Sequence, residues 1–336
     1  MTPPPPDLRR LVVGERVQHP FLLRAVDPRE SPGGGSYTVL TLGNATGELP
    51  AYIWSEQQHL IAGLRAGDVV QVIATVGEYR GKRKLEPTSI RPLPAGEARW
   101  EELVPAVANR EWYWDQLDEW RAKLRGPRLR AVLDLAFEDH DVRARFGDCP
   151  ASTHGHHALL GGLLKHVWEV GYMARAMAKA LRADPDLVTA GALLHDIGKL
   201  EAYDWSTGAF TTTDAGRALG HVVLGGLWIE RRLAEAGGLG LTPAERLLLQ
   251  HFVFSHHGRL EHGAAVRPMT LEAQLLHFAD DASAKGDSVA DALADPASFD
   301  GEAAVSSRGL WQLDGARVWR CSADWGAAEK ANDRPA

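Results

Sequence analysis

The hydrophobic pattern of this 336-residue chain changes its period once, and that change limits the folds it can adopt. From Gly14 to about Pro94, short apolar or alternating runs are separated by turn residues, which predicts β-strands. From Pro127 to the mid-280s, apolar residues recur at helical spacing and helix-capping signals repeat. The length suits about two domains. We therefore expect a multidomain α and β chain with a β domain first and an all-α domain second.

Composition and charge exclude several classes of protein. The chain is 45% hydrophobic and 24% charged, as in an ordinary globular protein. Its net charge of −7 argues against a generally basic coat for nucleic acid, although a local basic groove stays open. Two cysteines, Cys149 and Cys321, fit a reducing compartment. Because the sequence has neither a signal-peptide layout nor an apolar stretch that could span a bilayer, we expect a cytoplasmic protein without a membrane partner.

Five predicted strands make up the β part. They cover residues 21–26, 37–42, 48–54, 68–76 and 85–90, with a short helical piece at 55–64 between the third and the fourth. This order suits a small Greek-key barrel, the OB-fold. Such barrels hold single strands of nucleic acid with stacking aromatic rings and a basic groove.

Candidate substrate contacts lie on the third strand and on a basic hairpin. Tyr52 and Trp54 are two residues apart and so share one face of their strand. Positive charge would come from the hairpin residues Arg80, Lys82, Arg83 and Lys84. The alternative is that Trp54 belongs to the barrel core and that the basic run is a solvated hairpin tip.

The remaining segments follow from composition and capping signals. We expect a disordered Pro-rich arm at 1–13, the barrel at 14–95, a linking helix at 96–126, the helical domain at 127–290 and a C-terminal strap and tail at 291–336. The aromatic stripe of the linking helix predicts a docking face between domains. Helix starts are predicted after Asp184, Thr242 and Thr270, and another near His221.

The most informative short motif is a His195-Asp196 pair that ends an apolar run and precedes Gly198 and Lys199. An imidazole nitrogen beside a carboxylate oxygen suits a transition metal or Mn²⁺. The glycine lets the chain turn off a helix, and Lys199 would then offer a positive charge to phosphate oxygens. A His-Asp pair alone is more often a polar helix end.

Other possible ligands change that interpretation. His166, His221, the pair His256-His257 and Asp280 each lie on or beside a predicted helix, and a bundle can gather such positions in its core. A lone histidine on an apolar face, as His166 is, is more often a satisfied core residue. Together, however, buried imidazoles and carboxylates need partners, and a metal would partner all of them.

The order His166, His195-Asp196, Asp280 resembles the pattern of HD-domain metal phosphohydrolases. His221 and His256-His257 resemble the extra ligands of its two-metal members. With the barrel in front, the chain resembles the YhaM family of 3′→5′ exoribonucleases over about residues 15–320. The segments that carry this resemblance are 79–82, 150–166, 191–199, 220–225, 255–258 and 272–280.

The resemblance implies two divalent ions. One would be held by His166, His195, Asp196 and Asp280, and the other by His221, His256 and His257, with Asp196 bridging. It favours Mn²⁺, while the residues themselves also suit Fe²⁺, Co²⁺ or Zn²⁺. The chain departs from the family three positions after Asp280, where Ser283 stands in place of an acidic residue; Asp281 directly follows Asp280.

The hypothesis for function is hydrolysis of single-stranded RNA, or also of single-stranded DNA, with release of mononucleotides. Two ions would clamp the phosphodiester and activate a shared water, with Asp196 and Lys199 as the catalytic residues and Arg217 adding positive charge. His156 and His157 would contact a neighbouring phosphate or the leaving oxygen, or else support the ligands. The 3′→5′ direction comes only from the resemblance.

Two other functions stay open at this point. An HD phosphohydrolase could act on a small nucleotide or a cyclic dinucleotide, with the barrel used for docking. A non-catalytic single-strand-binding protein with a vestigial HD site is the second alternative. A homo-oligomer is compatible with the sequence.

Overall fold

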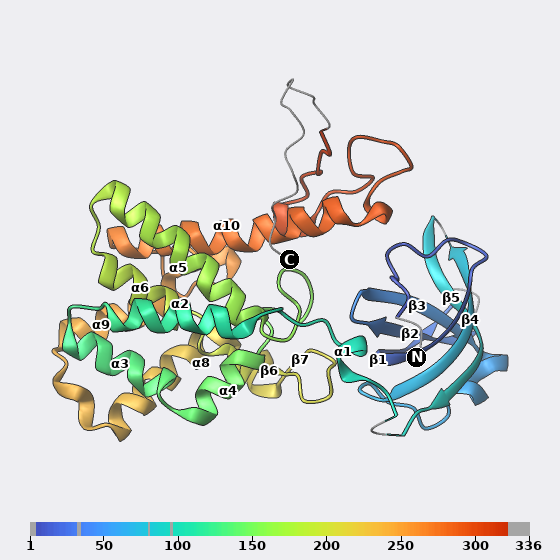
Figure 1. Cartoon of the computed structure of the whole chain (residues 1–336), viewed down its shortest axis with the longest axis horizontal. Coiled ribbons are helices and arrows are strands. Elements are labelled where there is room, and N and C mark those ends of the chain that lie inside the picture. The colour runs from blue at the N-terminus through green and yellow to red at the C-terminus, as the bar shows by residue number, and fades with distance from the viewer. Residues whose placement is uncertain (1–4, 32–34, 80, 95–96, 322–336) are drawn as a thin grey trace.

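The computed structural model describes residues 5–31, 35–79, 81–94 and 97–321. Figure 1 shows a β-barrel at one end of the long axis and a helical half at the other. The helices α1 (Trp100–Leu103) and α2 (Arg110–Ala122) follow the barrel in the chain. Arg80, part of an expected turn at 32–36 and the expected tail at 326–336 fall on positions outside the described residues.

The barrel confirms the predicted OB-fold. Its strands close in the order β1-β2-β3-β5-β4, with a parallel contact between Ala51 and Leu85 completing the ring. A bulge between Leu23 and Ala25 bends β1, so that its first half pairs with β4 and its second half with β2. The strands are β1 (Arg16–Glu30), β2 (Ser36–Asn44), β3 (Gly47–Trp54), β4 (Val69–Tyr79) and β5 (Lys82–Pro92), with the 3₁₀ helix η1 (Ser55–Ile61) between β3 and β4.

The segment before β1 differs from the expected disordered arm. Leu8 and Leu11 are buried in the barrel core. Arg83 fastens this segment, because its guanidinium donates to the carbonyl oxygens of Leu8, Arg9 and Leu11 at 3.2, 2.8 and 2.9 Å. Arg83 is thus engaged within the barrel, and alternation along β5 places it on the opposite face from Lys82 and Lys84.

The helical half begins where the capping signals predict. Asp184 accepts hydrogen bonds from two backbone N–H groups at the start of α6, and Thr242 forms a capping box with Glu245 at the start of α9. The helices are α3 (Pro127–Phe137), α4 (His140–Asp148), α5 (Gly162–Leu181), α6 (Pro185–Leu194), α7 (Lys199–Ala202), α8 (Asp214–Glu235), α9 (Pro243–Ser255) and α10 (Leu271–Ala294). A two-stranded pair, β6 (Tyr203–Asp204) and β7 (Thr211–Thr212), lies between α7 and α8.

The helix expected to start near His221 begins at Asp214 instead. Thr213 caps it, and the helix then breaks at Gly220, whose φ of 74° and ψ of 154° only glycine adopts readily. The break lies directly before His221. Gly220 therefore marks a break inside the helix and not its start.

The aromatic stripe of α2 packs within the helical half, which corrects the expected docking face between domains. Trp114 contacts Phe137 and Phe146, and Trp120 is buried in the helical core. Gly171 on α5 gives Trp120 room, since a Cβ there would lie 2.5 Å from its ring.

Contacts between the two halves are made by α1 and the loops around it. Leu22 of β1 is buried with Leu103 and Val104, against Leu160 and Phe210 of the helical half. Among the described residues, no helix combines the length and the apolar character needed to cross a membrane.

Candidate metal centre

Seven side chains from five segments meet inside the helical half. His166 projects from the middle of α5, His195 and Asp196 directly follow α6, His256 and His257 follow α9, and Asp280 lies on α10. His221 comes directly after the break in α8. Helix ends suit this role because a residue just past the last turn can leave the helix direction and face its neighbours.

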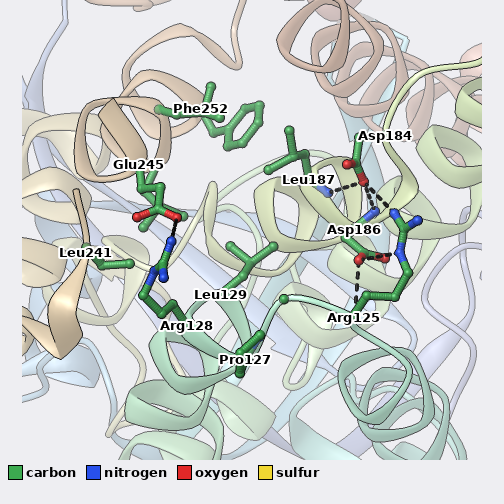
Figure 2. Close-up of a pocket in the computed structure, with 13 residues that line it drawn as sticks. Arg125, Pro127, Arg128, Leu129, Asp184, Asp186, Leu187, Leu241, Glu245 and Phe252 are labelled. Carbon is green, nitrogen blue, oxygen red and sulfur yellow. Dashed lines mark hydrogen bonds and ion pairs between the residues drawn. The ribbon is translucent and has the colours of Figure 1, made fainter. Parts of the chain in front are cut away.

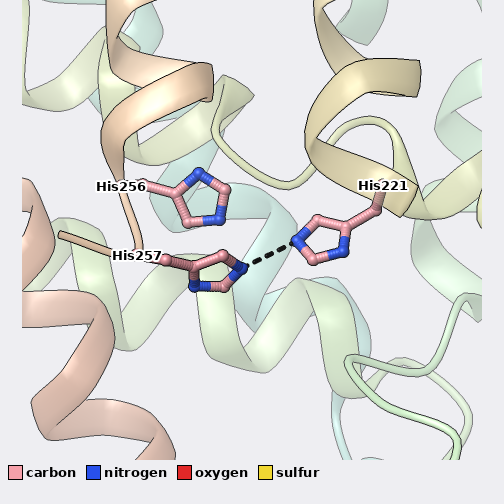
Figure 3. Close-up of side chains that lie close together, drawn as sticks. All are labelled: His221, His256 and His257. Carbon is pink, nitrogen blue, oxygen red and sulfur yellow. Dashed lines mark hydrogen bonds between the residues drawn. The ribbon is translucent and has the colours of Figure 1, made fainter. Parts of the chain in front are cut away.

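The histidines form two groups that could each hold a metal ion. One group is His166, His195 and Asp280, and the other is His221, His256 and His257. Within each group, ligand atoms lie within 4.8 Å of one another. Figure 3 shows how the three rings of the second group converge, with the Nε2 atoms of His257 and His221 3.1 Å apart.

Asp196 lies between the two groups. Its Oδ2 atom is 3.4 Å from His166 Nε2 and 3.3 Å from His195 Nε2. Its Oδ1 atom is 3.4 Å from His221 Nε2 and 3.6 Å from His256 Nε2. One carboxylate oxygen therefore faces each group.

Asp280 is shared in the same way. Its Oδ1 atom is 3.1 Å from His166 Nε2, and its Oδ2 atom is 3.4 Å from His257 Nδ1. The set of donors therefore consists of two groups of histidines with two carboxylates in common.

Hydrogen bonds fix the tautomer and the orientation of two of these rings. His195 Nδ1 donates to the carbonyl oxygen of Ala192 at 2.8 Å, and His256 Nδ1 donates to that of Val253 at 2.7 Å. A carbonyl oxygen only accepts, so Nδ1 carries the proton and the Nε2 lone pair of each neutral ring points towards Asp196.

Lone pairs that face one another call for a cation. Asp196 Oδ1 and His256 Nε2 are buried atoms that have no hydrogen-bond partner among the described residues. Ligand atoms bonded to one ion at about 2.0–2.2 Å lie about 3.0–3.6 Å apart, which is the range of the separations around Asp196. The residues present thus fit a pair of metal ions.

The electrostatics keep Asp196 ionised and keep the rings of His221 and His156 neutral, whereas the carboxylates of Asp196 and Asp280 raise the pKa of His166 in the protein without metal. Burial alone would raise the pKa of Asp196, but Lys199 and His195 hold it well below its usual range. Burial lowers the pKa of His221 to about 3, and it does the same for His156, where the charges of Lys199 and His166 add to the effect. Neutral imidazole and ionised carboxylate are the forms that bind metal.

The position of Lys199 differs from the expectation that its charge is offered to phosphate oxygens. It is buried, and its ammonium pairs with Asp196 Oδ2. Burial alone would lower the pKa of Lys199, but Asp196 raises it to about 12. Lys199 therefore acts on the centre through a shared carboxylate.

The other residues expected at the substrate lie at different distances from the centre. His156 is half-buried, with its ring centroid 5.8 Å from that of His166. His157 is only 1% exposed and pairs with Glu169 and Asp287, which favours the supporting role over a contact with substrate. Arg217 is exposed and lies 3.7 Å from Asp214. Asp281 pairs with Lys285 and not with the ligands.

A hollow of about 530 Å³ is lined by residues that follow His257 in the chain, among them Glu261, and was not expected from the sequence. Gly258, next to His257, lines it together with Arg259, Arg267 and Phe278. Within the described ranges, no carboxylate lies within ion-pair distance of either arginine. Arg259 and Arg267 lie on an irregular loop, so no periodic pattern in the sequence indicated them.

The barrel carries an aromatic strip, which we define as Tyr37, Tyr52, Trp54 and Tyr79. Ring centroids are 5.0 Å apart for Tyr37 and Trp54, and 5.8 Å apart for Tyr52 and Tyr79. Trp54 is 49% exposed, so the alternative that it belongs to the core is wrong. Tyr37 was missed, although it pairs directly with Trp54 across β2 and β3.

Lys84 lines a hollow of about 360 Å³ together with Tyr52 and Trp54, and it also pairs with Glu86 at 2.9 Å. Lys82 is exposed two residues before it, on the same face of β5. A cleft of about 940 Å³ lies between the two halves, lined by Arg24 of the barrel and by Arg110 and Lys165 of the helical half.

A separate pocket of about 510 Å³ lies beside α6 and α9 (Figure 2). It is lined by residues 125–129, by the start of α6 and by one side of α9, and none of the candidate ligands lines it. Its two arginines are engaged, Arg125 with Asp186 and Arg128 with Glu245. This pocket is not part of the metal centre.

Comparison with known proteins agrees with this architecture. A family model described as HD domain matches residues 163–285, which include every candidate ligand. The protein named 3′-5′ exoribonuclease YhaM of Geobacillus is 30% identical over 81% of this chain and 83% of its own length. The proteins of the same name from Bacillus subtilis and Shouchella clausii are 29% and 28% identical, over 81% and 83% of this chain and 86% of their own lengths. The chain therefore belongs to the YhaM family and is an HD-domain hydrolase.

Proposed function

We propose that this protein is a metal-dependent 3′→5′ exoribonuclease that hydrolyses single-stranded RNA and releases mononucleotides. The observation that carries the proposal is the pair of carboxylates, Asp196 and Asp280, that each face two groups of histidines. The RNA substrate and the direction of cleavage rest on the names of the relatives.

Two divalent ions, with Mn²⁺ as the first choice, would be held by His166, His195 and Asp280 on one side and by His221, His256 and His257 on the other, with Asp196 bridging. When bound, such a pair activates water and stabilises charge on the phosphate. Lys199 keeps Asp196 ionised and adds positive potential to the buried centre. His156 is neutral and lies beside His166, where it can hydrogen-bond a phosphate oxygen.

The substrate would be held by the barrel and by cations near the centre. The aromatic strip offers stacking surfaces that accept any base, and Lys82 and Lys84 lie beside it. Arg259 and Arg267 would take phosphate oxygens next to His257. Since stacking does not distinguish ribose from deoxyribose, single-stranded DNA would bind to the same strip.

The test uses 5′-labelled and 3′-labelled single-stranded RNA with and without Mn²⁺, beside Asp196→Ala and the control Asp281→Asn. We expect the 5′-labelled RNA to shorten gradually and the 3′-labelled RNA to release labelled mononucleotide at once. Activity should need metal, vanish in Asp196→Ala and persist in the control. Intact RNA with metal bound would refute the proposal and direct the search to small nucleotides.

A further inference from the structure

One ligand of the centre is connected to a carboxylate on its outer side. His166 Nδ1, the nitrogen that faces away from Asp196, lies 2.9 Å from Ser283 Oγ. Ser283 Oγ in turn lies 2.6 Å from Glu169 Oε2. His166 and Ser283 are buried, and the chain of contacts joins α5 to α10.

The direction of the protons along this chain follows from the groups present. An ionised carboxylate only accepts, so the single hydroxyl proton of Ser283 goes to Glu169. The hydroxyl oxygen then accepts from His166 Nδ1–H. The Nδ1–H of His166 is thereby held by Ser283, which leaves Nε2, the atom that faces Asp196 and Asp280, as the one available to a metal ion.

Glu169 is itself held in place. His157 Nε2 donates to the same Oε2 atom at 2.9 Å, and Lys165 lies 3.7 Å from Oε1. Asp287 secures His157 from the other side, with its Oδ1 atom 3.0 Å from His157 Nδ1 and its Oδ2 atom accepting from the His157 backbone N–H at 2.8 Å. A carboxylate fixed by two cations offers a stable acceptor for Ser283.

We infer that Glu169 is a positioning residue that acts through Ser283 to fix the ring orientation and the Nδ1–H tautomer of His166, and so sets the metal affinity of the group formed by His166, His195 and Asp280. This rests on the proposed metal centre. It also gives Ser283 a role, since its hydroxyl links His166 to the carboxylate of Glu169 one hydrogen bond further out.

The test compares metal affinity in the protein freed of metal and titrated with Mn²⁺ by calorimetry. Glu169→Gln places an amide N–H₂ where the acceptor was, which lets the serine proton turn to His166 and favours the Nε2–H tautomer that cannot bind metal. We expect affinity at this group to fall about 10- to 100-fold, as for other outer partners of metal-bound histidines.

Rescue separates positioning from a merely structural role. Ser283→Asp in the Glu169→Gln background puts a carboxylate directly at His166 Nδ1, and we expect affinity to return to within a few-fold of the starting protein. Asp281→Asn, on the same helix but paired with Lys285 instead of a ligand, is the matched control and should leave affinity unchanged. Where Glu169→Gln fails to fold by circular dichroism, Ser283→Ala takes its place with the same expected loss.

The outcomes are distinct. No Mn²⁺ binding by the unaltered protein would refute the proposed metal centre. Binding by the unaltered protein and equally tight binding by folded Glu169→Gln would overturn the inference alone. A folded double variant that stays weak would mean that Glu169 acts on the fold and not through His166.

Discussion

Replacing Trp54 by alanine tests whether the aromatic strip binds the substrate. The side chain is half-exposed and its ring lies 5.0 Å from that of Tyr37, on the surface of β2 and β3. The stability cost should be small, about 0.5–1.5 kcal/mol for the lost ring pair. The loss of a base stacked on the ring is worth about 1–3 kcal/mol.

That range converts to a rise in the dissociation constant of about 5- to 150-fold. The assay is fluorescence anisotropy with a labelled single-stranded RNA, in metal-free buffer so that the RNA stays intact. Trp319→Ala is the matched control, since Trp319 is 64% exposed but lies in the C-terminal strap. Trp54→Phe should recover most of the affinity because it restores a flat ring.

An unchanged dissociation constant in Trp54→Ala would refute the reasoning. So would an equal loss in Trp319→Ala, because binding would then not be specific to the barrel. A reduced cleavage rate with unchanged binding would place the effect of Trp54 at a later step.

Three further predictions concern the helical half. Asp196→Asn leaves the buried Lys199 without a counter-charge, so the free energy of unfolding in urea should fall by about 3–5 kcal/mol. Calorimetry should find no metal bound at either position. Retained binding of two ions would contradict a bridging role for Asp196. In Gly220→Ala the added Cβ meets no atom of the described residues within 4 Å, so the cost is backbone strain of about 1–3 kcal/mol. The helix should straighten, move His221 and weaken metal binding. Unchanged affinity and melting temperature would show that the break is not needed. Burial lowers the pKa of His156 and His221 from 6.5 to about 3, so between these pH values the unfolded chain binds more protons than the folded protein. The stability that is present above pH 6.5 should therefore be lost as the pH falls through this window. A constant melting temperature of the metal-free protein from pH 6.5 to 4 would argue against this.

Local signals in the sequence predicted a large part of this fold. Strand runs separated by turns gave the barrel, and Asp184, Thr242 and Thr270 marked helix starts because capping depends on neighbouring residues alone. The candidate ligands were found because His195-Asp196 and His256-His257 are short motifs at helix ends. Each of these features is decided within a few residues of chain.

Features that depend on distant pairing were not predictable in the same way. The sequence grouped Arg83 with Lys84 in one basic run and did not reveal that Arg83 binds the segment from Leu8 to Leu11. The contact between Ser283 and Glu169 joins residues 114 positions apart. Register and packing between segments decide such contacts, and the sequence of either segment alone does not contain them.

The sharing of Asp196 and Asp280 has a consequence for how the protein would respond to metal supply. An ion at either position would draw the shared oxygens into place and relieve the crowding of lone pairs, which leaves the second position better formed. Such coupling is reciprocal, so each ion would strengthen the retention of the other. The centre would then fill and empty cooperatively, and the protein would change between a competent and an idle form over a narrow range of metal concentration.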